Sequence, residues 1–192
     1  MIKPVKIEDF IIGPDRPCLI IAEAGVNHNG DIKLAHDLID AAVVAGVDAI
    51  KFQSFIAEDI VTLEAQKADY QIGTTGKNGS QFPMLKKLEL SGKQQEELKS
   101  HCDKANILYL CTPYEEKSAD LLERIGVAAY KIASTDTSNI PFLRYLAHKD
   151  IPVILSTGIS TLGEVEESVN DLKLHGLNGK IIILQCISEY PA

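Results

Sequence analysis

The chain is 192 residues long, which is enough for one domain with a sizeable core and too short for two domains of ordinary size. Hydrophobic residues make up 45% and charged residues 24%, a globular composition that excludes a disordered or fibrous chain. A net charge of -8 argues against a nucleic-acid or anionic-membrane surface. A small anionic substrate is compatible with this charge, because a few lysines in one cleft can hold a phosphate.

Targeting signals and cysteine pairs are both missing from the pattern. The start, MIKPVKIEDF, lacks the apolar core of a secretory signal, and no apolar run approaches the ~20 residues of a membrane helix. The cysteines form no CxxC pair, so we expect buried, reduced thiols. They are Cys18, Cys102, Cys111 and Cys186. The sequence predicts a cytoplasmic protein.

After a short polar lead-in, six apolar runs alternate with helical patterns. Continuous apolar runs of this kind are typical of buried parallel strands. The runs cover residues 18–24, 49–55, 107–112, 128–134, 152–157 and 180–186. Repeated strand–helix units predict an α/β fold with a parallel sheet. The pattern leaves two topologies open: a (β/α)8 barrel cut short, since a closed barrel takes ~250 residues, or an open doubly wound sheet.

Helix ends are marked by specific residues. Asp31 has the position of an N-cap and Gly46 that of a C-terminal stop. The spacing between them puts Leu34, Leu38 and Ala41 on one predicted apolar face. Capping-box spacing is found in Ser91 with Gln94 and in Thr161 with Glu164.

The connection between Phe55 and Ile107 is unusually long. Its middle reads YQIGTTGKNGSQF at 70–82, a composition that does not favour a regular element. Loops of this length are usually functional lids or disordered excursions, and we favour a lid.

Polar residues interrupt or follow every apolar run at its carboxyl end, where parallel α/β proteins gather their reacting groups. Six of six runs share this property, so the sequence predicts a site at that edge. The candidate residues, in chain order, are Glu23, Asn27, His28, Lys51, Gln53, Thr112, Lys131, Ser134, Asp136, Ser156, Ser188 and Tyr190.

Lys51 and Lys131 are the most informative of these, because a lysine within a buried strand must be neutralised, paired or aimed into a polar cavity. The ordinary explanation is a structural ion pair with Glu23 or Asp136. The functional alternatives are a pair of cations that hold phosphate and carboxylate groups, or a Schiff-base nucleophile. Asp136 would alternatively cap the following helix. His28 would contact a metal or a substrate, or be a solvated or hydrogen-bonded loop residue.

Several segments together resemble the sialic acid synthase family, which includes N-acetylneuraminate, legionaminate and pseudaminate synthases and spore-coat polysaccharide proteins. The matching runs are IIAEAGVNHNGD (20–31), AGVDAIKFQSF (45–55), MLKKLELS (84–91), CTPY (111–114), AAYKIASTDTSNIPFL (128–143), VILSTGIS (153–160) and LQCISEYPA (184–192). They occur in order across essentially the whole chain.

The resemblance implies a (β/α)8 TIM barrel, here truncated after about six strands, followed in the family by a small antifreeze-like domain. Residues 1–192 would then be the N-terminal part of the barrel. The resemblance also implies a divalent metal, Mn²⁺ or Mg²⁺, whose ligands we expect beyond Ala192, so that no residue of this chain is assigned to it. A homodimer is expected for the full-length protein.

The reaction implied is condensation of phosphoenolpyruvate with an N-acetylated hexosamine such as N-acetylmannosamine, which releases phosphate. By resemblance, Lys51 and Lys131 hold the phosphate and carboxylate, and Glu23 stabilises a cationic centre. Assisting or sugar-contacting roles fall to Asn27, His28, Gln53, Thr112, Ser134, Ser156, Ser188 and Tyr190. Asp136 would activate water or bind the sugar; it stands where many members have glutamate, and Ser188 where some have asparagine, so the preferred sugar stays open.

Two other hypotheses remain from the residues. One is a lysine Schiff-base aldolase that uses Lys131 as its nucleophile. The other is a truncated, non-catalytic chain that binds phosphoenolpyruvate or a sugar phosphate. We expect little or no synthase activity from the 192-residue chain itself, because the metal ligands are expected elsewhere.

Overall fold

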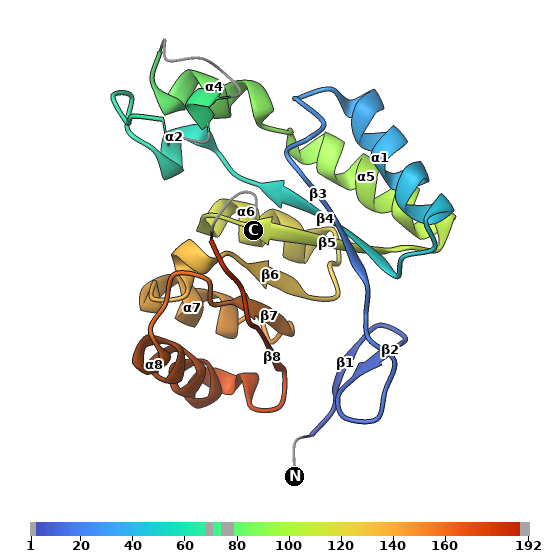
Figure 1. Cartoon of the computed structure of the whole chain (residues 1–192), viewed down its shortest axis with the longest axis vertical. Coiled ribbons are helices and arrows are strands. Elements are labelled where there is room, and N and C mark those ends of the chain that lie inside the picture. The colour runs from blue at the N-terminus through green and yellow to red at the C-terminus, as the bar shows by residue number, and fades with distance from the viewer. Residues whose placement is uncertain (1–2, 68–70, 74–78, 189–192) are drawn as a thin grey trace.

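The computed structural model describes residues 3–67, 71–73 and 79–188. Its centre is a curved sheet of six parallel strands with helices packed on its outer side (Figure 1). The strands are β3 (Ile21–Gly25), β4 (Ala49–Ser54), β5 (Leu108–Pro113), β6 (Tyr130–Ile132), β7 (Val153–Ser156) and β8 (Ile181–Leu184). All six predicted strands are therefore confirmed; five are shorter than their apolar runs, most of all β6, whereas β5 has the length of its run and is displaced by one residue.

The strand order decides between the two topologies that the sequence left open. The strands lie side by side in the order β3-β4-β5-β6-β7-β8, so each is paired with its neighbours in sequence. A doubly wound sheet reverses its order at a switch point, whereas a barrel never does. The sheet is therefore six consecutive strands of a (β/α)8-type barrel, with β3 and β8 at its two edges.

Helices connect the strands and cover the outer face of the sheet. They are α1 (Ile32–Val44), α2 (Ala57–Ile60), α4 (Gln81–Leu88), α5 (Gly92–Ala105), α6 (Glu116–Arg124), α7 (Ile140–Ala147) and α8 (Leu162–Leu172). A 3-10 turn, Ser134–Asp136, follows β6, and a π-helical segment, Lys173–Leu177, follows α8. Both predicted capping boxes are formed, at the starts of α5 and α8.

The predicted start of α1 is right, whereas its predicted apolar face is right for Leu38, which packs half-buried against the core, and wrong for Leu34 and Ala41, which are exposed. The Asp31 side chain accepts a hydrogen bond from the backbone N–H of Lys33, as an N-cap does. The buried face, however, consists of Ala35, Ile39 and Ala42, while Leu34 is 36% exposed. The face that is buried is therefore the one that carries two alanines and one isoleucine.

The polar lead-in contains a hairpin that the sequence did not indicate, since strands of three residues are too short to show alternation. β1 (Val5–Ile7) pairs antiparallel with β2 (Phe10–Ile12). Figure 1 places this hairpin at the end of the molecule opposite α2 and α4. Ile7 is fully buried and packs with inward-facing residues of the strands, so the hairpin covers the amino-terminal end of the sheet's concave side.

Apolar residues pack on both sides of the sheet. The larger cluster fills the space between sheet and helices and includes Ile50, Phe52, Tyr109, Leu122 and Leu143. The smaller cluster lies on the concave side and consists of Ile7, Ala49, Leu108, Leu110, Ala129 and Ile154. The two sets alternate along each strand, as the two-residue period of a strand requires.

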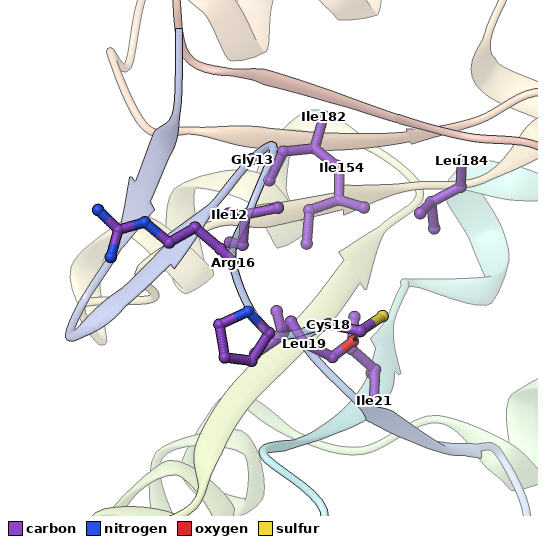
Figure 2. A pocket seen from close by; sticks show the side chains of 10 residues that line it. Ile12, Gly13, Arg16, Cys18, Leu19, Ile21, Ile154, Ile182 and Leu184 are labelled. Atoms are coloured by element: carbon purple, nitrogen blue, oxygen red, sulfur yellow. Dashed lines mark hydrogen bonds between the residues drawn. The ribbon is translucent and has the colours of Figure 1, made fainter. Parts of the chain in front are cut away.

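A cavity of about 410 Å³ lies at the hairpin end of the concave side. Figure 2 shows Ile12 of the hairpin, Ile21 of β3 and Ile182 of β8 among the residues around it. Its lining is mostly aliphatic, so this hollow does not coincide with the polar residues at the carboxyl ends of the strands.

Cys102 and Cys111 are buried as predicted, and all four cysteines are free thiols. The prediction is wrong for Cys18, which is exposed in the segment that leads from the hairpin to β3, and Cys186 is only half-buried after the end of β8. The middle of the predicted lid, 70–82, lies outside the described residues at 70 and 74–78, so the lid itself stays a prediction; 71–73 and 81–82 are helical, so the prediction that this stretch has no regular element is wrong there. Within the described ranges, no helix has the length and apolarity needed to cross a membrane.

Candidate active site

The concave side of the sheet changes from apolar to polar toward the carboxyl ends of the strands. On β4, Ala49 belongs to the inner apolar cluster, and Lys51 and Gln53 follow on the same side because strand side chains alternate. The β4–β5 register pairs Gln53 with Thr112, and on β7 the same alternation puts Ser156 two residues beyond Ile154. The sequence-predicted residues of these strands therefore share one polar layer.

Lys51 is the centre of the first cluster in this layer. Its Nζ lies 3.0 Å from Glu23 Oε1, and the register places these two residues directly opposite each other on β3 and β4. The same ammonium donates to Thr112 Oγ1 at 3.1 Å and to the Phe52 carbonyl at 3.4 Å. The Lys51 side chain is only 7% exposed, whereas that of Glu23 is 59% exposed. The expected ion pair with Glu23 is thus formed, and its carboxylate faces solvent.

Lys131 has no such carboxylate. Its ammonium donates to the Ile132 carbonyl at 3.0 Å and to the hydroxyl of Ser156. Burial, together with the positive charge of Lys51, lowers the pKa of Lys131 from 10.5 to about 8. Within the described ranges no acidic side chain forms an ion pair with it, so a structural ion pair does not explain this lysine.

A third cluster surrounds the backbone of Gly158, just after β7. Its N–H donates to Ser134 Oγ at 2.9 Å. A Cβ atom at position 158 would lie 2.4 Å from Ser188 Oγ and 3.1 Å from Ser134 Oγ. The two hydroxyls therefore converge on a position that only glycine fits. The loops after β6, β7 and β8 meet here.

Asp136 ends the 3-10 turn after β6. Burial raises the pKa of its carboxyl group, and hydrogen bonds from Asn139 Nδ2 at 3.3 Å and Thr135 Oγ1 at 3.4 Å act in the opposite direction. The cap of α7 is Asn139, so the alternative that Asp136 caps this helix is wrong. Among the residues that the structure describes, Asp136 pairs with neither lysine.

Asn27 and His28 lie between β3 and α1. Asn27 is exposed, whereas His28 is fully buried. The Gly30 N–H donates to His28 Nδ1 at 3.0 Å, and burial lowers the pKa of the ring, which favours its neutral form. His28 is therefore a hydrogen-bonded loop residue rather than a solvated one. Tyr190 lies outside the described residues.

Two residues near the site were not among the predicted ones. Gly158 gave no signal because a single glycine after a strand is common. Cys186 follows β8, and its thiol is close enough to raise the pKa of Lys131 slightly against the effect of burial. Its position two residues beyond the inward-facing Leu184 is the signal that could have found it.

The described residues include no group of three or more His, Cys, Asp or Glu side chains that could hold a metal ion. The donors brought together here are ammonium groups, hydroxyls and one exposed carboxylate, which do not fit a divalent cation. Their chemistry instead fits an anion with several oxygen atoms.

Comparison with known proteins assigns the chain to a protein family. Residues 38–192 match the NeuB family. The chain is 47% identical over 175 residues to the N,N'-diacetyllegionaminic acid synthase of Campylobacter jejuni, covering 91% of this chain and 52% of that protein. It is 32% identical over 183 residues to human N-acetylneuraminate-9-phosphate synthase, covering 94% of this chain and 49% of the human protein. The chain belongs to the NeuB family.

Solved structures agree with this assignment. The N-acetylneuraminic acid synthetase of Leptospira borgpetersenii, determined in complex with citrate, superposes with a TM-score of 0.84 at 34% identity over 99% of this chain and 61% of that chain. The spore coat polysaccharide biosynthesis protein SpsE of Bacillus subtilis gives a TM-score of 0.80 at 35% identity, over 98% of this chain and 49% of that one. The chain spans about half the length of the curated relatives it matches.

Proposed function

We propose that the polar layer binds phosphoenolpyruvate, and that the chain serves the condensation of this substrate with an N-acetylated hexosamine to give a nonulosonic acid and phosphate. The observation that carries the proposal is the Lys131 ammonium, which is half-buried, forms no ion pair with an acidic side chain of the described residues and lies near a second lysine. An anionic ligand would stabilise the charged form of this lysine, because the ligand supplies a negative charge that no ion pair among the described residues supplies.

Two lysines suit the two anionic groups of phosphoenolpyruvate. One ammonium would receive the phosphate and the other the carboxylate, with hydroxyls of Thr112 and Ser156 already hydrogen-bonded to them. Ser134 and the Gly158 backbone add polar groups at the rim. Charge-assisted hydrogen bonds of this kind are about twice as strong as neutral ones.

Condensation requires the substrate carbons to be held while charge develops. The enolpyruvate methylene carbon forms a bond to the sugar aldehyde, and the phosphate-bearing carbon becomes cationic. Glu23, beside Lys51, would stabilise that charge. Water adds to the cationic carbon and gives one proton to a base, and the aldehyde oxygen takes up one proton to become a hydroxyl. The C–O bond to phosphate then breaks as the added hydroxyl passes its proton to the leaving phosphate and becomes the keto group. Asp136 is proposed as this base, because its raised pKa makes it a stronger base than an ordinary carboxylate.

The identities of the sugar and of the metal are proposed from the family resemblance and not from the geometry of the site. N-acetylmannosamine or a related sugar would contact Ser188 and Tyr190, and assistance from Asn27, His28 and Gln53 is also proposed. A divalent cation, Mn²⁺ or Mg²⁺, is proposed for the full-length protein, with ligands outside the residues described here. A homodimeric full-length protein, an antifreeze-like second domain and a cytoplasmic location are proposed on the same basis.

One observation favours a second function. A lysine whose pKa is about 8 is partly neutral near neutral pH, and a neutral amine is the form that attacks a carbonyl group. Lys131 is thus also suited to act as a Schiff-base nucleophile toward a keto acid.

Calorimetric titration of phosphoenolpyruvate into the chain tests the proposed binding. We expect one site, and we expect Lys51→Met and Lys131→Met each to weaken binding at least about tenfold, since each removes a charged hydrogen bond. Lys180→Met is the matched control, because Lys180 precedes β8 at the other end of the sheet and pairs with Asp150 at 2.7 Å. Equal affinity in all four proteins would contradict the assignment.

Two further assays separate the functions. Phosphate release by the full-length protein in the presence of manganese should require N-acetylmannosamine, whereas the 192-residue chain alone should release little or none; release without a sugar would contradict condensation. Borohydride reduction with pyruvate should leave Lys131 unmodified, whereas a stable adduct on Lys131 would favour the Schiff-base function.

A further inference from the structure

At its carboxyl end, strand β4 extends further than the neighbouring strand β3. Pairing between the two strands ends at Gly25 and Phe52, after an irregularity between Glu23 and Gly25. The next residue, Gln53, still pairs with Thr112 of β5. The Ser54 carbonyl accepts a bond from Tyr114 N–H on the β5 side at 3.1 Å, and successive residues of a strand direct their backbone groups to alternate sides. The Gln53 carbonyl therefore faces the side where β3 has ended.

A side chain of α5 takes the place of the missing strand. Gln95, fully buried in the first turns of α5, donates from Nε2 to the Gln53 carbonyl at 3.0 Å. Its Oε1 accepts a hydrogen bond from the Tyr109 hydroxyl, which comes from β5. Tyr109 is 1% exposed, and its ring stacks on Phe52 with a centroid distance of 5.9 Å. Gln95 of α5 thus links the carboxyl end of β4 to the Tyr109 side chain of β5.

The orientation of this amide is determined by its partners. A backbone carbonyl can only accept, so the NH₂ group of Gln95 must face Gln53 and its oxygen must face Tyr109. Burial raises the pKa of the Tyr109 hydroxyl well above its ordinary value, so the hydroxyl keeps the proton that it donates. Leaving either polar group unpaired in the interior would be unfavourable, because it would lose its hydrogen bonds to water without replacement.

We propose that Gln95 is a positioning residue of the site: it holds the end of β4 so that the Gln53 side chain stays directed into the polar layer beside Lys51. The close approach of Gln53 to β3 supports this placement, because a Cβ at Gly25 would lie 3.7 Å from Gln53 Nε2 and 3.0 Å from Glu23 Oε1. The consequence for ligand binding rests on the proposed function, but the positioning itself does not.

The first test reads Gln53 directly, in the 192-residue chain without ligand. The side-chain ¹⁵N–¹H₂ resonances of Gln53 are assigned by their loss in Gln53→Ala. Gln95→Met keeps the volume and removes both hydrogen bonds, and we expect it to shift or broaden these resonances. Tyr109→Phe, which keeps the ring stack, should act in the same direction to a smaller extent. Tyr130→Phe is the matched control, because its hydroxyl donates to the Ala119 carbonyl at 2.9 Å on α6, away from Gln53.

The second test uses a variant whose hydrogen bonding depends on pH. In Gln95→Glu, a protonated carboxyl group can donate to the Gln53 carbonyl and accept from Tyr109, whereas a carboxylate cannot donate. The Gln53 resonances should therefore resemble the wild type at pH 5 and Gln95→Met at pH 8. A merely space-filling role of Gln95 predicts no such pH dependence. Gln53 resonances that stay unchanged in Gln95→Met would overturn the proposal, as would Gln53 resonances that do not change while the carboxyl ¹³C resonance of Gln95→Glu shows that the introduced group loses its proton.

A double-mutant cycle then connects positioning to binding. If Gln95 acts through Gln53, Gln95→Met should weaken phosphoenolpyruvate binding about fivefold, and adding it to Gln53→Ala should cause no further loss. Additive losses would overturn the proposal. If the wild type binds no phosphoenolpyruvate but the Gln53 resonances respond as expected, the proposed function fails and the positioning role stands.

Discussion

Binding of phosphoenolpyruvate should weaken as the pH rises through about 8, because Lys131 then loses its proton. Affinity should fall, not rise, with increasing pH because the ligand is anionic and interacts with the charged form of the lysine. The phosphate group, with a second pKa of about 6, is already dianionic above about pH 7 and does not contribute to the change. A change in binding affinity between pH 7 and pH 9 therefore reports the protonation of Lys131 and not that of the phosphate group.

The expected size follows from the pKa. With a pKa of about 8, Lys131 of the free chain is roughly nine-tenths protonated at pH 7 and roughly one-tenth at pH 9. If only the protonated form binds, the association constant should fall about tenfold between these values, or about 1.4 kcal/mol. Isothermal titration at half-unit intervals of pH measures this directly.

Two variants identify the titrating group. Lys131→Arg keeps its charge throughout this range and should give a flat profile, because arginine does not lose its proton in proteins. Lys131→Met should bind weakly at every pH. A flat wild-type profile, or an unchanged step at pH 8 in Lys131→Met, would refute the assignment of Lys131 as an anion-binding cation.

Further predictions concern single residues. Lys131→Met should raise the free energy of unfolding at pH 7 by roughly 2 kcal/mol in urea titrations, because burial disfavours the charged lysine; a decrease would contradict it. Glu23→Gln should tighten phosphoenolpyruvate binding a few-fold, about 1 kcal/mol, because Lys51 loses its competing carboxylate; weaker binding in calorimetry would count against this. Gly158→Ala should weaken binding roughly tenfold by displacing Ser134 and Ser188, with unchanged affinity as the contrary result. Leu143→Ala should lower the unfolding free energy by about 2–5 kcal/mol, and a smaller loss would mean that its surroundings collapse onto the cavity.

Local patterns made much of the fold and the site predictable. Strands that are buried on both faces read as apolar runs, and a lysine within such a run stands out, as Lys51 and Lys131 do. The two-residue period of a strand then places Lys51 and Gln53 on one side without any knowledge of tertiary contacts. Capping residues such as Ser91 and Thr161 were equally local signals.

Features that depend on distant contacts were not predictable. The buried face of α1 contains Ala35, Ile39 and Ala42, and helical periodicity alone did not distinguish it from the predicted face beside it. Gln95 reads as an ordinary polar helix residue, and only the early end of β3 creates the orphan carbonyl that it satisfies. Likewise, nothing local distinguishes Lys51, which forms an ion pair with Glu23, from Lys131, for which the described residues show no ion pair.

A crystal structure of the chain with phosphoenolpyruvate is the most direct test of the proposed site. The ligand should lie at the carboxyl ends of β4 to β7, with its phosphate and carboxylate oxygens within about 3.2 Å of the Nζ atoms of Lys51 and Lys131. A ligand bound elsewhere, for example in the aliphatic cavity beside the hairpin, or one that contacts neither lysine, would contradict the proposed function.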